Sequence, residues 1–160
     1  MSKFTEAEKV QILEDLVAIK SVNDNEMEVC MYLKDLLSQH NIDAKIVKIN
    51  DTRANLVAEI GESGPVLGIS GHMDVVSEGD IKKWTYDPFK LTEVDGKLHG
   101  RGAADMKSGL AALAIALIEI KKNNDLSKGT IKFMATVGEE MEQSGSRQLY
   151  EKGYCDDLDA

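Results

Sequence analysis

The sequence has few basic residues, few cysteines and no long hydrophobic run. Its 19 Lys and Arg residues stand against 28 Asp and Glu residues, which gives a formal net charge of −9 at pH 7. This balance argues against a nucleic-acid binder or a binder of anionic membranes, because both carry negative charge themselves. We therefore expect no nucleic acid and no membrane among the partners of the protein.

The absence of a long apolar run and the low number of cysteines limit where the protein is located and whether it contains disulfides. The longest apolar run covers residues 110–118, whereas a helix that crosses a bilayer needs about 20 apolar residues. Residues 1–10 lack the apolar core of a secretory signal, so we expect a cytoplasmic protein. Cys30 and Cys155 lie far apart without Cys or His neighbours at ligand spacing, so we expect both to be reduced rather than paired or bound to zinc.

What the sequence does contain predicts one folded α/β unit. Hydrophobic residues make up 42% of the chain, enough for one core in 160 residues. The helices expected from capping signals and three-to-four-residue apolar spacing are residues 6–20 after a Thr5/Glu8 capping box, a second helix from the turn at 23–25 to His40, a buried helix over 105–122, and residues 143–152.

Strands alternate with these helices. Residues 44–49 and 55–60 are expected to pair as a hairpin or as neighbours at a mixed edge of the sheet. Residues 65–70 read as a central strand covered on both faces, and residues 130–137 as the next strand. The order strand, long crossover, helix, strand predicts a parallel pair. The expected fold is therefore α/β, with a mostly parallel sheet and helices on both faces.

Ligands of such sheets bind outside the carboxyl ends of the strands, and two unusual segments follow there. His72 and Asp74 come just after the strand at 65–70. They are either a metal ligand and the carboxylate that orients it, or ordinary loop residues. Glu139 and Glu140 follow the strand at 130–137, where one can bind metal while the other moves protons. Adjacent glutamates also occur simply as the acidic first turn of a helix.

A third segment, the glycine-flanked residues 100–109, opens the buried helix. Asp105 in this segment is either a member of the same site or an N-cap, and Lys107 either neutralises the carboxylates or lies on the surface. The segment fits neither the Walker pattern nor G-x-G-x-x-G. One histidine with several carboxylates and no cysteine suits a divalent cation in a hydrolytic site better than a structural zinc site.

These motifs resemble a known family. SGHMDVV, W-x-x-D-P-F, DGKLHGRGAADMKSG and ATVGEE occur in this order and resemble the M20 family of metallopeptidases and deacylases, in its acetylornithine deacetylase and succinyl-diaminopimelate desuccinylase branch. The resemblance implies a zinc-peptidase-like catalytic domain with two Zn²⁺ ions per active site, Co²⁺ being a possible substitute. It implies that His72 and Glu140 each bind one ion, that Asp105 bridges both, that Asp74 orients His72 and that Glu139 is the general base. It also implies a cis peptide after Asp105.

The implied activity is hydrolysis of a small N-acyl amino acid or peptide, with N-succinyl-LL-diaminopimelate, an intermediate of lysine biosynthesis, as the favoured substrate. Acetylornithine deacetylase, aminoacylase and dipeptidase activities are alternatives, and an inactive fragment or a non-catalytic binding module is an alternative of another class. Family members are more than twice as long as this chain. We therefore expect residues 1–160 to be a partial catalytic domain, inactive alone, whose parent is a homodimer. The remaining metal ligands, the lid or dimerisation domain and the C-terminal catalytic segment are expected beyond Ala160.

Overall fold

The computed structural model describes residues 3–160 as an α/β fold in which every helix and strand expected from the sequence has a counterpart. The helices are α1 (Glu6–Ala18), α2 (Met27–Ser38), α3 (Lys107–Asn123) and α4 (Ser144–Glu151), with a short 3-10 turn, η1 (Ile81–Lys83). The strands are β1 (Ala44–Lys48), β2 (Ala54–Ser63), β3 (Val66–His72), β4 (Thr92–Val94), β5 (Lys97–His99) and β6 (Gly129–Thr136). The ends of these elements differ from the expected ends by a few residues.

The main sheet is mixed, so the expectation of a mostly parallel sheet is wrong. Its strand order is β1-β2-β6-β3. β3 and β6 are parallel, as the crossover through α3 predicts, but β1 with β2 and β2 with β6 are antiparallel. The physical reason is the short connections: residues 49–53 are too few for a crossover, so β1 and β2 form the expected hairpin. Residues 64–65 likewise reverse the chain between β2 and β3, and β6 then inserts between them.

The position of β3 is also a correction. β6 occupies the inner position that the sequence assigns to residues 65–70, and β3 lies at the end of the four-stranded order. The two faces of β3 are covered only in part: Gly68 lies against Leu158 and Gly71 against Leu110, but Leu67 and Ser70 are exposed, as an edge position allows. The outer edge of β3 meets the last residues: the Asp159 amide donates to the Val66 carbonyl at 2.9 Å, and the Gly68 amide donates to the Ala160 carbonyl at 2.7 Å.

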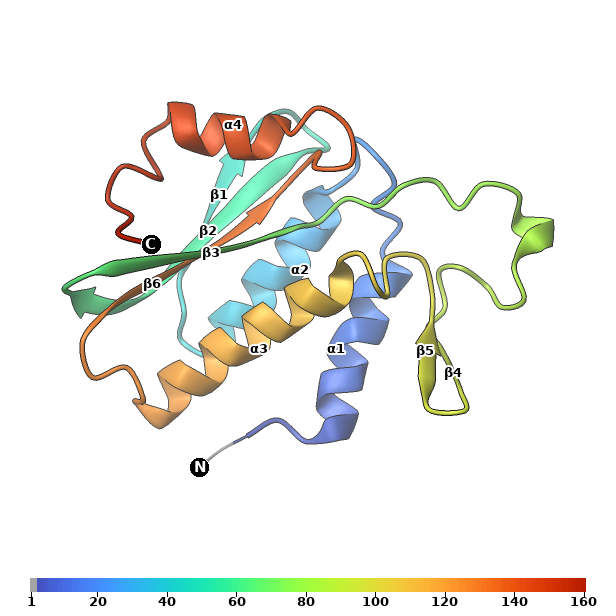
Figure 1. Cartoon of the computed structure of the whole chain (residues 1–160), viewed down its shortest axis with the longest axis horizontal. Helices are drawn as coiled ribbons and strands as arrows, with labels where there is room; N and C mark the ends of the chain where they lie inside the picture. Colours follow the sequence, from blue (N-terminus) through green and yellow to red (C-terminus); the bar gives the residue numbers. More distant parts are fainter. Residues whose placement is uncertain (1–2) are drawn as a thin grey trace.

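Helices cover both faces of the sheet, as predicted. Figure 1 shows α1, α2 and α3 together on one face and α4 alone on the other, while β4, β5 and the loop around η1 project to one side. The larger core lies between the three helices and the sheet and includes Leu16, Leu33, Leu110, Ile118 and Phe133. A smaller core under α4 consists of Val47, Val57, Met134 and Leu149.

Local signals explain the first helix and the state of the cysteines. The Thr5 side chain accepts from the Glu8 amide and Glu8 reaches back to the Thr5 amide, which confirms the capping box. Cys30 is buried, Cys155 is half-buried, and both are free. Within residues 3–160, none of the helices combines the length and the apolar character needed to cross a bilayer.

Candidate metal centre

The chemically unusual residues meet at one edge of the sheet. β3 and β6 run parallel with His72 opposite Thr136, so the carboxyl ends of both strands lie together. His72 ends β3, Glu139 and Glu140 follow β6, and Asp105 lies just before α3. This is the place where parallel strands are expected to present ligand-binding residues.

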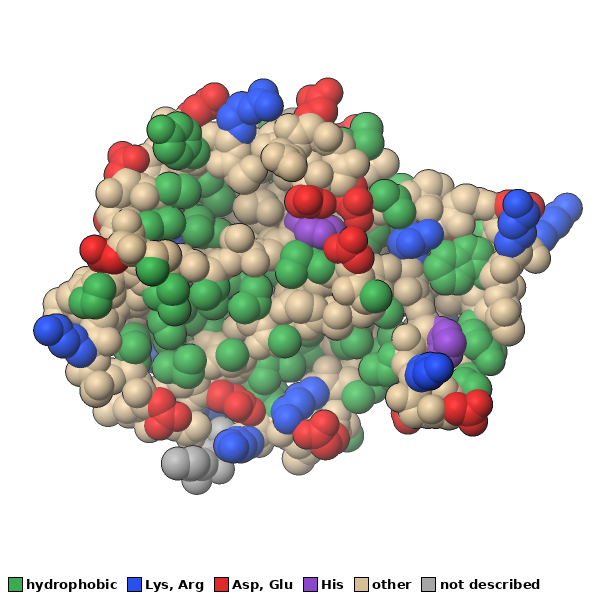
Figure 2. All heavy atoms as spheres, viewed as in Figure 1, with side chains coloured by type: hydrophobic (Ala, Val, Ile, Leu, Met, Phe, Trp, Pro, Cys, Tyr) green, Lys and Arg blue, Asp and Glu red, His purple; other side chains and the backbone are tan. Residues whose placement is uncertain are grey.

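Three side chains form the centre of this arrangement. One nitrogen of His72 and one carboxylate oxygen each from Asp105 and Glu140 all lie within 4.8 Å of one another. His72 Nε2 is 3.0 Å from Asp105 Oδ1 and 3.7 Å from Glu139 Oε2. Figure 2 shows acidic side chains gathered around a histidine in a hollow of the surface. An imidazole with carboxylates is a donor set that zinc and similar divalent cations accept, so these residues fit a metal ion.

Asp74 lies behind the cluster and organises it. Its carboxylate is fully buried and accepts hydrogen bonds from the amides of Glu139, at 3.1 Å, and Glu140, at 3.0 Å. The Asp74 carbonyl lies 3.0 Å from His72 Nδ1. With the Nδ1 proton donated to this carbonyl, Nε2 is the ring nitrogen left to bind a cation, which is the usual arrangement of a metal-binding histidine.

The electrostatics of the cluster follow from its excess of carboxylates. Burial lowers the pKa of His72, but hydrogen bonds to Asp74 and Asp105 and the charge of Asp74 outweigh burial and raise the pKa to about 9. Burial raises the pKa of Asp74, yet the hydrogen bonds from His72 and from two backbone amides lower it overall. Burial and the charge of Asp105 raise the pKa of Glu140. A cation bound here would relieve this repulsion.

Asp105 does not act as the N-cap of the buried helix. α3 begins two residues later than expected, at Lys107, and its N-cap residue is Met106, which makes no side-chain capping bond. The Asp105 carboxylate faces His72 instead. The peptide between Asp105 and Met106 is cis, as the family resemblance implies.

Comparison with known proteins agrees with this geometry. The model of "Peptidase family M20/M25/M40" matches residues 68–160, more than half of the chain. The chain belongs to the M20 peptidase family. The matched segment contains all five site residues predicted from the sequence.

Curated relatives within the M20 family extend along almost the whole chain. "Probable succinyl-diaminopimelate desuccinylase" of Staphylococcus epidermidis is 59% identical over 158 residues, which cover 99% of this chain and 39% of the relative. "Succinyl-diaminopimelate desuccinylase" of Rickettsia rickettsii is 36% identical over 91% of this chain and 41% of the relative. The chain therefore spans about two fifths of the length of these relatives.

Solved M20 structures share the fold. Human carnosine dipeptidase 1 superposes with a TM-score of 0.78 and 27% sequence identity, over 96% of this chain and 37% of that protein. The mixed sheet with helices on both faces is thus the arrangement seen in part of a larger M20 enzyme.

The sequence analysis misplaced one residue near the site, Lys107, and missed two others, Arg53 and Asn55. Lys107 neither neutralises the cluster nor lies on the surface: it is fully buried and donates to the carbonyls of Leu16, at 2.7 Å, and Ile19, at 2.6 Å. Burial lowers its pKa to about 8. Arg53 and Asn55 at the start of β2 contact the segment after β6. Their only sequence signal is a pair of polar residues, two apart, beside an otherwise apolar strand.

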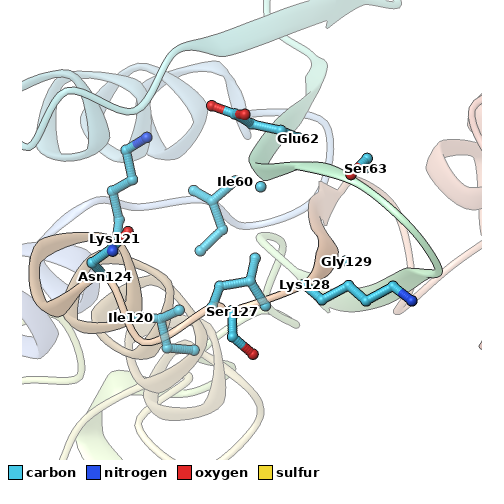
Figure 3. A pocket seen from close by; sticks show the side chains of 11 residues that line it. Ile60, Glu62, Ser63, Ile120, Lys121, Asn124, Ser127, Lys128 and Gly129 are labelled. Carbon is cyan, nitrogen blue, oxygen red and sulfur yellow. The ribbon is translucent and has the colours of Figure 1, made fainter.

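Two hollows of the surface differ in how their charged groups are arranged. One, of about 440 Å³, adjoins the cluster and is lined by His72 and Glu139 together with Met106, Met134 and Leu149. The other, of about 410 Å³, lies at the end of α3 and the start of β6. Figure 3 shows that its two lysines, Lys121 and Lys128, point to opposite sides. Its charged groups therefore do not converge on a common ligand, whereas those at His72 do.

Proposed function

We propose that the protein is the metal-binding part of an amide hydrolase that converts N-succinyl-LL-diaminopimelate and water to succinate and LL-diaminopimelate. The observation that carries the hydrolytic chemistry is the convergence of His72, Asp105 and Glu140 within 4.8 Å. The substrate is inferred from the names of the relatives that match nearly the whole chain. Dipeptide hydrolysis is the second candidate, because the fold of carnosine dipeptidase 1 is so similar.

The donor set supports a role for each residue. His72 and Glu140 would each hold one of two Zn²⁺ ions, or Co²⁺ in their place, and Asp105 would lie between both. Bound ions of this kind polarise a carbonyl and lower the pKa of water. Asp74 orients the His72 ring through Nδ1 and fixes the loop that carries Glu140. We place the remaining ligands, the lid and the dimer contacts in the part of the relatives that this chain does not span.

Glu139 is the proposed general base. Its side chain is half-exposed and lies 3.7 Å from His72 Nε2, so one carboxylate oxygen can face both the cluster and solvent. Glu139 would take a proton from the attacking water and return it to the departing amine nitrogen. The buried Asp74 does not take part in proton transfer in this scheme. It is a positioning residue that orients the His72 imidazole.

Zinc content after dialysis tests the site assignment. We expect the wild-type chain to retain zinc at neutral pH and Asp105→Ala to lose it, because the variant removes the oxygen 3.0 Å from His72 Nε2. Asp125→Ala, an exposed aspartate after α3, is the matched control and should retain zinc. Stoichiometric zinc that is unaffected by Asp105→Ala would overturn the assignment.

Substrate choice needs a separate assay. The protein carrying these residues should release succinate from N-succinyl-LL-diaminopimelate faster than it releases acetate from N-acetylornithine or cleaves a dipeptide. A preference for either of the other substrates would reject the desuccinylase proposal while leaving the metal site intact. An unchanged function after Glu139→Ala would favour the non-catalytic module.

A further inference from the structure

One buried side chain fastens both ends of the loop that carries Glu139 and Glu140. Asn55, on β2, is fully buried. Its Oδ1 accepts from the Val137 amide at 3.0 Å, just before the loop. Its Nδ2 donates to the Gly145 carbonyl at 3.1 Å, just after the loop, and to Gln148 Oε1 at 3.0 Å. The loop of residues 138–144 is therefore closed at its base by the Asn55 amide, whose donor and acceptor are both used, beside the Gly145 amide, which donates to the Val137 carbonyl at 3.1 Å.

A second side chain from the same strand end supports the first residue of the loop. The Arg53 guanidinium packs so closely against Gly138, whose φ is +69°, that a Cβ at this position would lie 2.6 Å from Nη2. Arg53 is held from the other side by the buried Glu26, with Nε at 3.0 Å from Oε2 and Nη2 at 2.8 Å from Oε1. The bidentate ion pair with Glu26 leaves the Arg53 guanidinium little freedom to move.

The tip of the loop is fixed by Asp74, which accepts from the Glu139 and Glu140 amides. Base, first residue and tip are thus each held by a different side chain. We propose that Arg53 and Asn55 are positioning residues, which fix the loop of residues 138–144 and through it the distances of Glu139 and Glu140 from His72. The inference rests on the proposed function only for the role of the two glutamates.

Asn55→Asp tests whether the Asn55 amide holds the loop of residues 138–144, with almost no change of side-chain volume. The aspartate keeps an oxygen for the Val137 amide but places its second oxygen against the Gly145 carbonyl, where an N–H donor is needed. In the metal-free protein, amide hydrogen exchange at Glu139 and Glu140 should become about tenfold faster or more, while exchange at Phe133 in β6 stays unchanged. The matched control is Asn50→Asp, at an exposed asparagine whose side chain accepts from the amide and the hydroxyl of Thr52, and it should change neither rate.

Zinc affinity gives the second measurement, by competition with a chromogenic chelator. Positioning of Glu140 predicts that Asn55→Asp weakens zinc binding by about tenfold or more, as for other residues that orient metal ligands. Should Asn55→Asp fold poorly, the double variant Glu26→Gln/Arg53→Gln replaces the ion pair with two amides and leaves no buried charge unpaired. It is expected to shift exchange and zinc affinity in the same direction.

The outcomes distinguish a failure of the positioning role of Asn55 from a failure of the proposed function. Equal acceleration of exchange at Glu139 and Phe133 with unchanged zinc affinity would mean that Asn55 stabilises the whole fold without positioning the loop, which overturns the inference. A wild-type chain of residues 1–160 that binds no zinc would mean that the site needs the ligands placed outside this chain, and zinc affinity would then be compared in the full-length protein. The ratio of exchange rates at Glu139 and Phe133 would then still decide whether Asn55 holds the loop.

Discussion

The two adjacent glutamates after β6 lie in different surroundings, and this predicts different effects of the same substitution. Glu140 belongs to the donor cluster, whereas Glu139 lies beside it and is half-exposed. In the full-length protein, Glu139→Gln should retain zinc and reduce hydrolysis of N-succinyl-LL-diaminopimelate by a factor of about 10² to 10⁴, the usual contribution of a general base. Glu140→Gln should lose zinc. Elemental analysis and turnover measured on the same samples check both expectations, and zinc loss in Glu139→Gln would contradict them.

At the residue scale, the sequence predicts the groups that meet at the strand ends better than the groups that support them. His72, Glu139 and Glu140 stand out because each directly follows an apolar strand. Arg53 and Asn55 do not, because their meaning depends on partners far along the chain: Val137 is 82 positions and Gly145 is 90 positions from Asn55. A polar residue type does not reveal that its side chain is buried with satisfied bonds.

At the element scale, α1 and α3 are joined by the buried Lys107. Its ammonium donates to two carbonyls at the end of α1, where the helix dipole favours positive charge. Lys107→Met leaves the Leu16 and Ile19 carbonyls buried without this donor, so the free energy of unfolding should fall by about 1 to 3 kcal/mol. Urea denaturation checks the value, with the exposed Lys121→Met on the same helix as the control. A variant as stable as the wild type would show that desolvation of the ammonium cancels both bonds.

The elements themselves were predictable because their signals are local, and their order in the sheet was not. The Thr5/Glu8 capping box and the apolar spacing of residues 110–118 identify α1 and α3 without tertiary information. The insertion of β6 between β2 and β3 depends on pairings such as Ile60 with Ile131. No local pattern encodes such a pairing, so the parallel pair was predicted correctly and the overall balance of strand directions was not.

At the scale of the whole molecule, the segment of residues 153–160 docks on the sheet face that α4 leaves open. Its Tyr154, Cys155 and Leu158 pack against the smaller core. The buried Lys132 of β6 bonds to Asp157 and to the Tyr154 carbonyl, and Glu59 lies 3.2 Å from the same ammonium. The Asp157 carboxylate of the segment therefore forms an ion pair with the Lys132 ammonium of the sheet.

This ion pair predicts how the stability of the docked segment depends on pH. The hydrogen bond to Lys132 lowers the pKa of Asp157 below its ordinary value of 3.8. A carboxylate with a lowered pKa in the folded state adds stability above its ordinary pKa and loses that contribution as the pH falls through the lowered value. Asp157→Asn should therefore have a lower urea midpoint than the wild type at pH 7, and the two midpoints should converge below pH 3.8. Asp156→Asn changes the net charge equally without touching Lys132, so its midpoint should stay at the wild-type value at pH 7. A difference between wild type and Asp157→Asn that persists unchanged in acid would show that packing of Tyr154 and Leu158, rather than the charge pair, holds the segment against the sheet.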